Sequence, residues 1–122
     1  MLKDDFYFIT SNEKVATTIQ ASTQLNPNHP IFAGHFPGEP IVPGVCLIQM
    51  CREVLEDALK TGFLLQKIPN IKFLAPVNPL KHEILHFQFD LTLFGESQKS
   101  KILITLPDGT IVLKGAMLYK KK

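Results

Sequence analysis

The chain has 122 residues, 45% of them apolar, and its thirteen basic and eleven acidic residues give a net charge of +2. This length and composition fit one globular domain over residues 1–122, although so short a chain often completes its site with a second copy. Without a basic stripe among aromatic residues, the near-neutral charge argues against a nucleic-acid surface. The start of the chain does not resemble a signal peptide, and no apolar run approaches the roughly 20 residues of a bilayer span, so we expect a cytoplasmic protein without membrane contacts.

In chain order, the sequence predicts two strands, one helix and then about four strands. Alternating apolar and polar residues predict a half-buried strand over Val15–Leu25, with Phe6–Thr10 paired to it as an edge strand. An apolar stripe at helical spacing predicts one helix of about four turns, with Gly62 as its C-terminal stop. The stripe consists of Leu47, Ile48, Cys51, Val54, Leu55, Ala58 and Leu59.

Strand patterns resume after the helix. They cover Ile68–Phe73, Glu83–Leu93, Lys101–Leu106 and Ile111–Tyr119, with turns at Phe94–Glu96 and Pro107–Thr110. The second of these strands has five large apolar residues on one face, which must be buried. With only one substantial helix, an antiparallel sheet of about six strands curled around it buries the most apolar surface. The sequence therefore predicts the α+β class.

The segment GHFPGEPIVPGV, residues 34–45, contains three prolines and three glycines. Proline fixes its own φ angle, and glycine permits close backbone approach, so the segment is pre-organised and His35 is expected to be held in one place. Gly44 and Val45 open the helix, where unpaired N–H groups and the helix dipole stabilise an anionic oxygen. A base beside such an oxyanion site indicates enolate chemistry.

The same segment, Gly34-His35-Phe36-Pro37-Gly38, then Pro40-Ile41 and Pro43-Gly44-Val45, resembles the active-site segment of a known family. That family is the hot-dog-fold 3-hydroxyacyl-acyl carrier protein dehydratases of fatty acid synthesis. The resemblance extends to His29–Phe32 and Ile71–Val77. It implies a hot-dog fold over nearly the whole chain, and an acyl carrier protein or acyl-CoA thioester as substrate.

By this resemblance, His35 takes the proton α to the thioester carbonyl, and a backbone N–H of Gly44 or Val45 polarises that carbonyl. Phe36 is assigned to substrate binding in the same way. The family uses a Glu or Asp of the other subunit's helix for the departing hydroxyl, and the matching residue here is Gln49. A carboxamide can orient a water or a hydroxyl, but it has no titratable proton near pH 7.

The family often has a glutamine four residues after its acid, where this chain has Glu53. Glu53 stays a reserve candidate for the acid, since one helical turn, about 6 Å along the axis, separates it from Gln49. Its place in a polar helix face predicts instead a solvated or ion-paired carboxylate. That face consists of Gln49, Arg52, Glu53, Glu56, Asp57 and Lys60.

Other polar residues receive no catalytic role. Cys46 and Cys51 are expected to be buried reduced thiols, and neither a metal nor a cofactor is predicted. His82 and His86 are expected at the surface, on the polar side of their strand, and His29 lacks a catalytic setting. Glu39 is expected to be solvated on a turn.

The lysines near the C-terminus allow two interpretations. Lys120–Lys122, together with Lys67, Lys72 and Lys81, could attract an acidic acyl carrier protein. A solvated, frayed terminus explains the last three equally well.

Three hypotheses about function remain open. The first is a 3-hydroxyacyl-thioester dehydratase that uses His35 with either Glu53 or a water held by Gln49. The second is a non-catalytic acyl-thioester-binding subunit that partners an active relative, and the third is a hot-dog thioesterase. The spacing of the 34–45 segment favours the first two. A homodimer or heterodimer through edge strands and helix-flanking loops is expected, with Pro76–Pro79 near the acyl tunnel.

Overall fold

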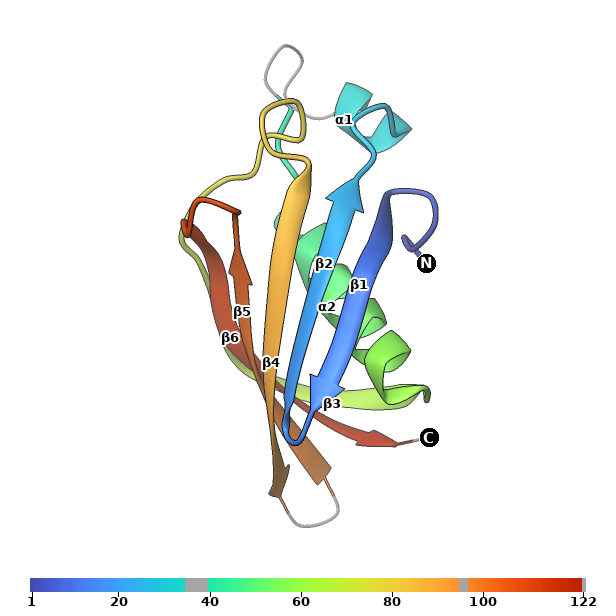
Figure 1. The fold of residues 1–122 in the computed structure, drawn as a ribbon, viewed down its shortest axis with the longest axis vertical. Helices are drawn as coiled ribbons and strands as arrows, with labels where there is room; N and C mark the ends of the chain where they lie inside the picture. Colours follow the sequence, from blue (N-terminus) through green and yellow to red (C-terminus); the bar gives the residue numbers. More distant parts are fainter. Residues whose placement is uncertain (35–39, 95–96, 122) are drawn as a thin grey trace.

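The computed structural model describes residues 1–34, 40–94 and 97–121. These residues form β1 (Tyr7–Val15), β2 (Thr18–Leu25), α1 (Pro30–Gly34), α2 (Gly44–Leu59), β3 (Phe63–Phe73), β4 (Ile84–Phe94), β5 (Ser97–Thr105) and β6 (Ile111–Lys121). All strand pairs are antiparallel and make one six-stranded sheet in the order β1-β2-β4-β5-β6-β3. Figure 1 shows this sheet curving around α2, with β1 and β3 as its two edges. The predicted α+β architecture of about six strands around one long helix is confirmed.

The core lies between α2 and the face of the sheet that it covers. The predicted apolar face of β4 is confirmed for Leu85, Phe87 and Phe89, which are buried together with residues of α2 in one cluster. On α2 the predicted stripe packs as expected, and Met50 extends it into the same cluster. The apolar periodicities of β4 and α2 therefore identify the two surfaces that meet in the core.

The prediction of a single strand over Val15–Leu25 is wrong at its start. Val15 ends β1, residues 16 and 17 form a turn, and β2 begins at Thr18. Ala16 adopts the left-handed conformation with φ of 55°, although the turn contains no glycine, asparagine or proline. Because the sequence has no such turn signal here, the alternation of apolar and polar residues continues through the turn, and the predicted strand begins too early. The edge strand is correspondingly longer than the predicted Phe6–Thr10.

The helix begins at Gly44, as the 34–45 segment indicates, and ends before the predicted stop at Gly62. Lys60 adopts the left-handed conformation with φ of 57°, and its N–H donates to the Glu56 carbonyl. A lysine thus provides the C-cap geometry for which the sequence indicates a glycine.

The strand predicted over Ile68–Phe73 starts earlier, at Phe63, and passes through Pro69. Proline is tolerated there because β3 is an edge strand, so its missing N–H breaks no interior ladder. The short helix α1 was not predicted. The hairpin at Pro107–Thr110 is confirmed, with the Leu106 N–H donating to the Thr110 carbonyl at 2.9 Å.

The turn predicted at Phe94–Glu96 falls partly outside the described residues, since residues 95 and 96 are not among them. The pairing of β4 with β5 extends to Phe94 opposite Ser97. Among the helices of the described ranges, none has the length and apolar content needed to cross a membrane.

Candidate active site

The N-terminus of α2 presents two backbone N–H groups. Pro43 caps the helix with extended backbone angles, and its carbonyl accepts hydrogen bonds from the Cys46 and Leu47 N–H groups at 2.9 and 3.2 Å. No acceptor for the Gly44 or Val45 N–H occurs among residues 1–34, 40–94 and 97–121. The Val45 side chain is 75% exposed, so this end of the helix is open. Both N–H groups can therefore donate to a bound carbonyl oxygen.

An apolar groove with a volume of about 350 Å³ lies at this end of the helix. It runs between the start of α2 and the segment that follows β3, and the Val42 N–H holds the two together by donating to the Val77 carbonyl at 2.9 Å. The lining residues are Ile41, Val42, Gly44, Leu47, Phe73, Leu74, Ala75, Pro76 and Val77. The groove thus contains Pro76, near which the sequence places the acyl chain.

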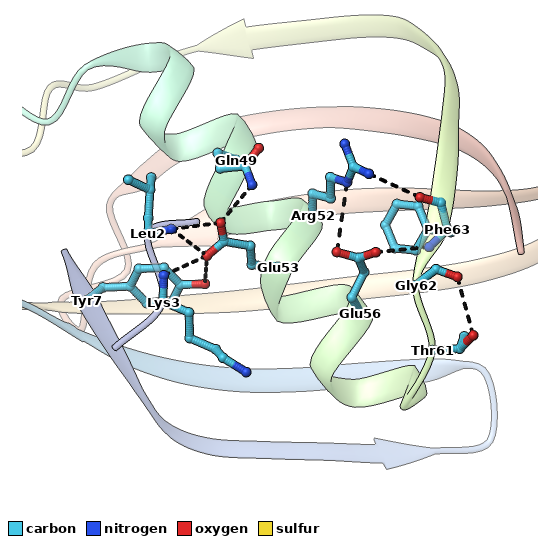
Figure 2. Close-up of polar contacts among 10 residues, drawn as sticks. All are labelled: Leu2, Lys3, Tyr7, Gln49, Arg52, Glu53, Glu56, Thr61, Gly62 and Phe63. Carbon is cyan, nitrogen blue, oxygen red and sulfur yellow. Dashed lines mark hydrogen bonds and ion pairs between the residues drawn. The ribbon is translucent and has the colours of Figure 1, made fainter. Parts of the chain in front are cut away.

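Further along the helix, Gln49 is hydrogen bonded to Glu53. The Gln49 Nε2 donates to Glu53 Oε2 at 2.7 Å (Figure 2). Gln49 lies five residues after Gly44, about 7.5 Å along the helix axis, whereas Glu53 lies nine residues after it, about 13.5 Å along. Of the two, Gln49 is thus the nearer to the helix N-terminus along the axis.

Glu53 is only 3% exposed, and among the described residues no basic side chain forms an ion pair with it, so the prediction of a solvated or ion-paired carboxylate is wrong. Besides Gln49, three donors bind it: the Leu2 N–H at 2.9 Å, the Lys3 N–H at 2.8 Å and the Tyr7 hydroxyl at 3.0 Å (Figure 2). Burial raises the pKa of this carboxyl, but the hydrogen bonds outweigh burial and hold the pKa below its ordinary value. Glu53 is therefore an ionised anchor for the N-terminal segment.

Other residues of the predicted polar helix face also have hydrogen-bond or ion-pair partners. Arg52 lies 3.8 Å from Glu56, and its Nη2 donates to the Phe63 carbonyl at 3.2 Å. Asp57 accepts from Asn12 Nδ2 at 3.0 Å and lies 3.6 Å from the Lys3 ammonium. This face therefore contacts β1, β3 and the N-terminal segment, and it is not simply solvated.

Several predicted residues fall outside the described part of the chain. His35, Phe36 and Glu39 are among residues 35–39, so their assigned roles stay predictions. Gly44, Val45 and Gln49 are brought to the same end of α2, and Glu53 lies one turn beyond them.

Two histidines lie away from this end of α2, and two cysteines are buried along the helix. His86 is half-buried and not fully at the surface, with Nδ1 2.8 Å from the Ser22 hydroxyl on the neighbouring strand. His29 interacts with Asp5 at 3.1 Å. Cys46 and Cys51 are buried free thiols, as predicted, and burial raises the pKa of both. In the described ranges, no cluster of three His, Cys, Asp or Glu side chains could hold a metal ion.

The sequence did not reveal the residues that hold Glu53. Leu2, Lys3 and Tyr7 lie 51, 50 and 46 residues upstream of it, and two of them donate through the backbone. A backbone donor leaves no signal in the choice of amino acid, so only the tertiary fold identifies it.

Known proteins share both sequence and fold with this chain. A family model described as ApeI-like, ApeI dehydratase, matches residues 11–103. A 3-hydroxyacyl-[acyl-carrier-protein] dehydratase FabZ from Caldicellulosiruptor bescii is 31% identical over 104 residues, which cover 78% of this chain and 71% of the relative. Another FabZ, from Wolbachia sp. subsp. Drosophila simulans (strain wRi), is 38% identical over 72 residues, which cover 51% of this chain and 48% of the relative.

Among solved structures, the dehydratase heterocomplex ApeI:P from Xenorhabdus doucetiae superposes with a TM-score of 0.74. The superposition covers 93% of this chain and 96% of that chain at 21% identity, so it establishes the shared fold. The sheet curled around one helix is the hot-dog fold that the resemblance implied. With a family model that matches most of its length and a FabZ relative above 30% identity, the chain belongs to the ApeI-like dehydratase family of FabZ-like hot-dog proteins.

Proposed function

We propose that this protein acts on 3-hydroxyacyl thioesters carried by acyl carrier protein or coenzyme A, as a dehydratase with an altered site. The observation that carries the proposal is the open N-terminus of α2, where the Gly44 and Val45 N–H groups stand at the end of an apolar groove. The N–H groups would polarise the thioester carbonyl, and the groove would take part of the acyl chain.

In the proposed reaction, His35 takes the α proton, the resulting enolate is stabilised at the helix N-terminus, and the bond from C3 to the hydroxyl oxygen breaks. The departing oxygen then needs a proton to leave as water. Gln49 cannot supply one, and Glu53 is ionised and engaged by four donor groups. In this proposal Gln49 orients the hydroxyl, and the proton comes from water or from the protonated His35.

A second candidate is a non-catalytic acyl-thioester-binding subunit that pairs with an active hot-dog dehydratase. The lack of a protonated carboxyl at positions 49 and 53 favours it, because the family places its acid on the helix at the first of these positions. The solved relative is, by its own description, a heterocomplex. A partner of the same fold could supply the missing carboxylate while His35 acts on the shared substrate.

The test is to incubate the purified protein with 3-hydroxyacyl and saturated acyl thioesters. Dehydration yields an enoyl product from the first substrate only, whereas a thioesterase releases free thiol from both. A binding subunit does neither alone and gains enoyl formation when an active hot-dog dehydratase is added. His35→Ala should lower any dehydration about 10²-fold or more. Unchanged turnover in that variant would remove His35 from the mechanism.

A further inference from the structure

The Gln49 carboxamide is held at one of its two ends. Its terminal torsion is soft, so a free glutamine can present either its oxygen or its nitrogen to a ligand. Here Glu53 accepts the hydrogen bond at 2.7 Å, and an ionised carboxylate can only accept. The nitrogen end must therefore face Glu53, and Figure 2 shows the Gln49 oxygen pointing away from it.

Glu53 in turn has little freedom to release the amide. Leu2 N–H contacts both carboxylate oxygens, at 3.2 and 2.9 Å, while Lys3 N–H and Tyr7 hydroxyl both donate to Oε1. Burial and the nearby Glu53 charge raise the pKa of Tyr7, so its phenol remains a donor at neutral pH. Any rotation of the carboxylate would break several of these bonds at once in a buried setting.

The outward end of the carboxamide is free to bind. Within the described ranges, no group donates to Gln49 Oε1. Gln49 is half-buried, about 7.5 Å along the axis from the helix N-terminus. An acceptor oxygen to which no described group donates is thus available at position 49.

We infer that Glu53 is a positioning residue that presents Gln49 Oε1 as a fixed hydrogen-bond acceptor, so that position 49 selects an acyl chain with a 3-hydroxyl over one with a 3-oxo group. The inference rests on the proposed function, in which Gln49 orients the hydroxyl of the substrate. A hydroxyl can donate to this oxygen, whereas a ketone oxygen would face it with no proton between them. Such a mismatch leaves a desolvated acceptor unpaired, which disfavours binding.

The ligand test uses amide analogues of 3-hydroxyacyl and 3-oxoacyl pantetheine, in short, medium and long chains matched in pairs. The amide in place of the thioester prevents turnover. Calorimetry on the full chain should show about tenfold tighter binding of the 3-hydroxyacyl analogue. Glu53→Gln frees the Gln49 carboxamide to turn, so the ratio of the two binding affinities should fall towards one. Glu56→Gln is the matched control and should retain the preference, because Glu56 bonds to the Phe63 N–H and does not contact Gln49.

A second measurement tests the hydrogen bond between Gln49 and Glu53 without any ligand. In the wild-type protein, the side-chain NH₂ resonances of Gln49 should keep a hydrogen-bonded shift until the pH falls far enough to protonate Glu53. Glu53→Gln should abolish this pH dependence, while Glu56→Gln should leave it in place. A Gln49 amide that shows no coupling to Glu53 protonation would overturn the positioning role.

Gln49→Met keeps the side-chain length and removes both polar ends, and it leaves the other donors to Glu53 intact. This variant covers the case in which Glu53→Gln fails to fold, and a retained 3-hydroxyl preference in it overturns the inference. Equal binding of both analogues by the wild-type protein also overturns the inference, while the proposed function stands. Binding of neither analogue at any chain length overturns the proposed function, and with it the ligand assigned to position 49.

Discussion

The ring of Phe73 packs against the backbone of Gly44 so closely that a β-carbon at position 44 would stand 2.9 Å from its Cζ atom. This contact joins the end of β3 to the first residue of α2. The ring is 53% exposed and lines the apolar groove, so it covers the backbone next to the Gly44 N–H without being locked in the core. The contact makes the size of residue 44 and the position of the Phe73 ring interdependent.

Gly44→Ala is expected to weaken binding of acyl analogues about tenfold while changing the free energy of unfolding by less than about 1 kcal/mol. The exposed Phe73 ring can swing away from the new methyl group, and alanine favours the helix over glycine. The displaced ring then occupies part of the groove. Calorimetry with acyl amide analogues and chemical denaturation measure the two effects.

Phe73→Ala should restore binding in the Gly44→Ala background, because it removes the ring that the methyl group displaces. Leu74→Ala is the control, since Leu74 lines the same groove and none of its atoms is among the three nearest to a β-carbon at position 44. Equal recovery with either second substitution would mean that groove volume matters and that the Gly44–Phe73 contact does not.

Glu53 is expected to make folding stability depend on pH at the acidic end. Because its folded pKa lies below the ordinary value of 4.5, its contribution is fully present above that value and is lost as the pH falls through the folded pKa. Glu53→Gln should therefore flatten the acidic part of the stability profile and lower stability near pH 7 by about 1–3 kcal/mol. Denaturation series across the acidic range measure both effects.

Glu56→Gln provides the comparison for that profile. Glu56 is more exposed and has Arg52 and the Phe63 N–H as its partners. Its replacement should leave the slope of the acidic limb close to that of the wild-type protein. If the two variants flatten the limb equally, the slope does not come from the buried network around Glu53.

The sequence predicts those features of the structure that depend on a local pattern, and it does not predict those that depend on residues far apart in the chain. The alternation in β4 and the stripe in α2 predict the fold because each is a local pattern with one buried face. The helix start at Gly44 is likewise encoded locally. The burial of Glu53 is not, since it belongs to the polar face of the helix and the donors that enclose it come from residues 2, 3 and 7. The contact between Phe73 and Gly44 similarly needs the path of β3 through space.

The β3 edge is expected to be part of a dimer interface. β3 pairs only with β6, so one side of this eleven-residue strand has no partner strand in the described sheet. A long edge with exposed apolar side chains is a template for pairing with a second chain, and Leu64, 55% exposed, lies on it. Sedimentation should show a dimer at micromolar concentration, whether as a homodimer or with a related hot-dog subunit.

Leu64→Lys should shift that equilibrium towards monomer by placing a charge in the interface. Leu80→Lys is the matched control, because Leu80 is 65% exposed and lies outside the strands. Only monomer in the wild-type protein, tested alone and with a related hot-dog subunit, would contradict the prediction. Equal effects of the two lysine variants would place the interface elsewhere.

The final prediction concerns the exchanged residue types at positions 49 and 53. Gln49→Glu restores a carboxyl where the family has its acid, and a general acid typically contributes about 10²–10⁴-fold to the rate. In this chain, however, the new carboxyl would stand where the Gln49 amide now donates to Glu53 Oε2 at 2.7 Å. Repulsion between two carboxylates raises the pKa of the new acid, and the pair would share its proton.

The double variant Gln49→Glu with Glu53→Gln should therefore form enoyl product faster than Gln49→Glu alone. The oxygen of a glutamine at position 53 can accept from the Leu2 and Lys3 N–H groups, and its NH₂ can donate to one oxygen of the new carboxyl, which leaves the other oxygen, with its proton, for the departing hydroxyl. Adding His35→Ala should abolish this gain if base and acid act together. Suppose instead that the natural protein already turns over at an ordinary enzymatic rate, Gln49→Glu changes nothing and Glu53→Gln is inactive. The acid would then be Glu53, and the buried network around it would have to open during each turnover.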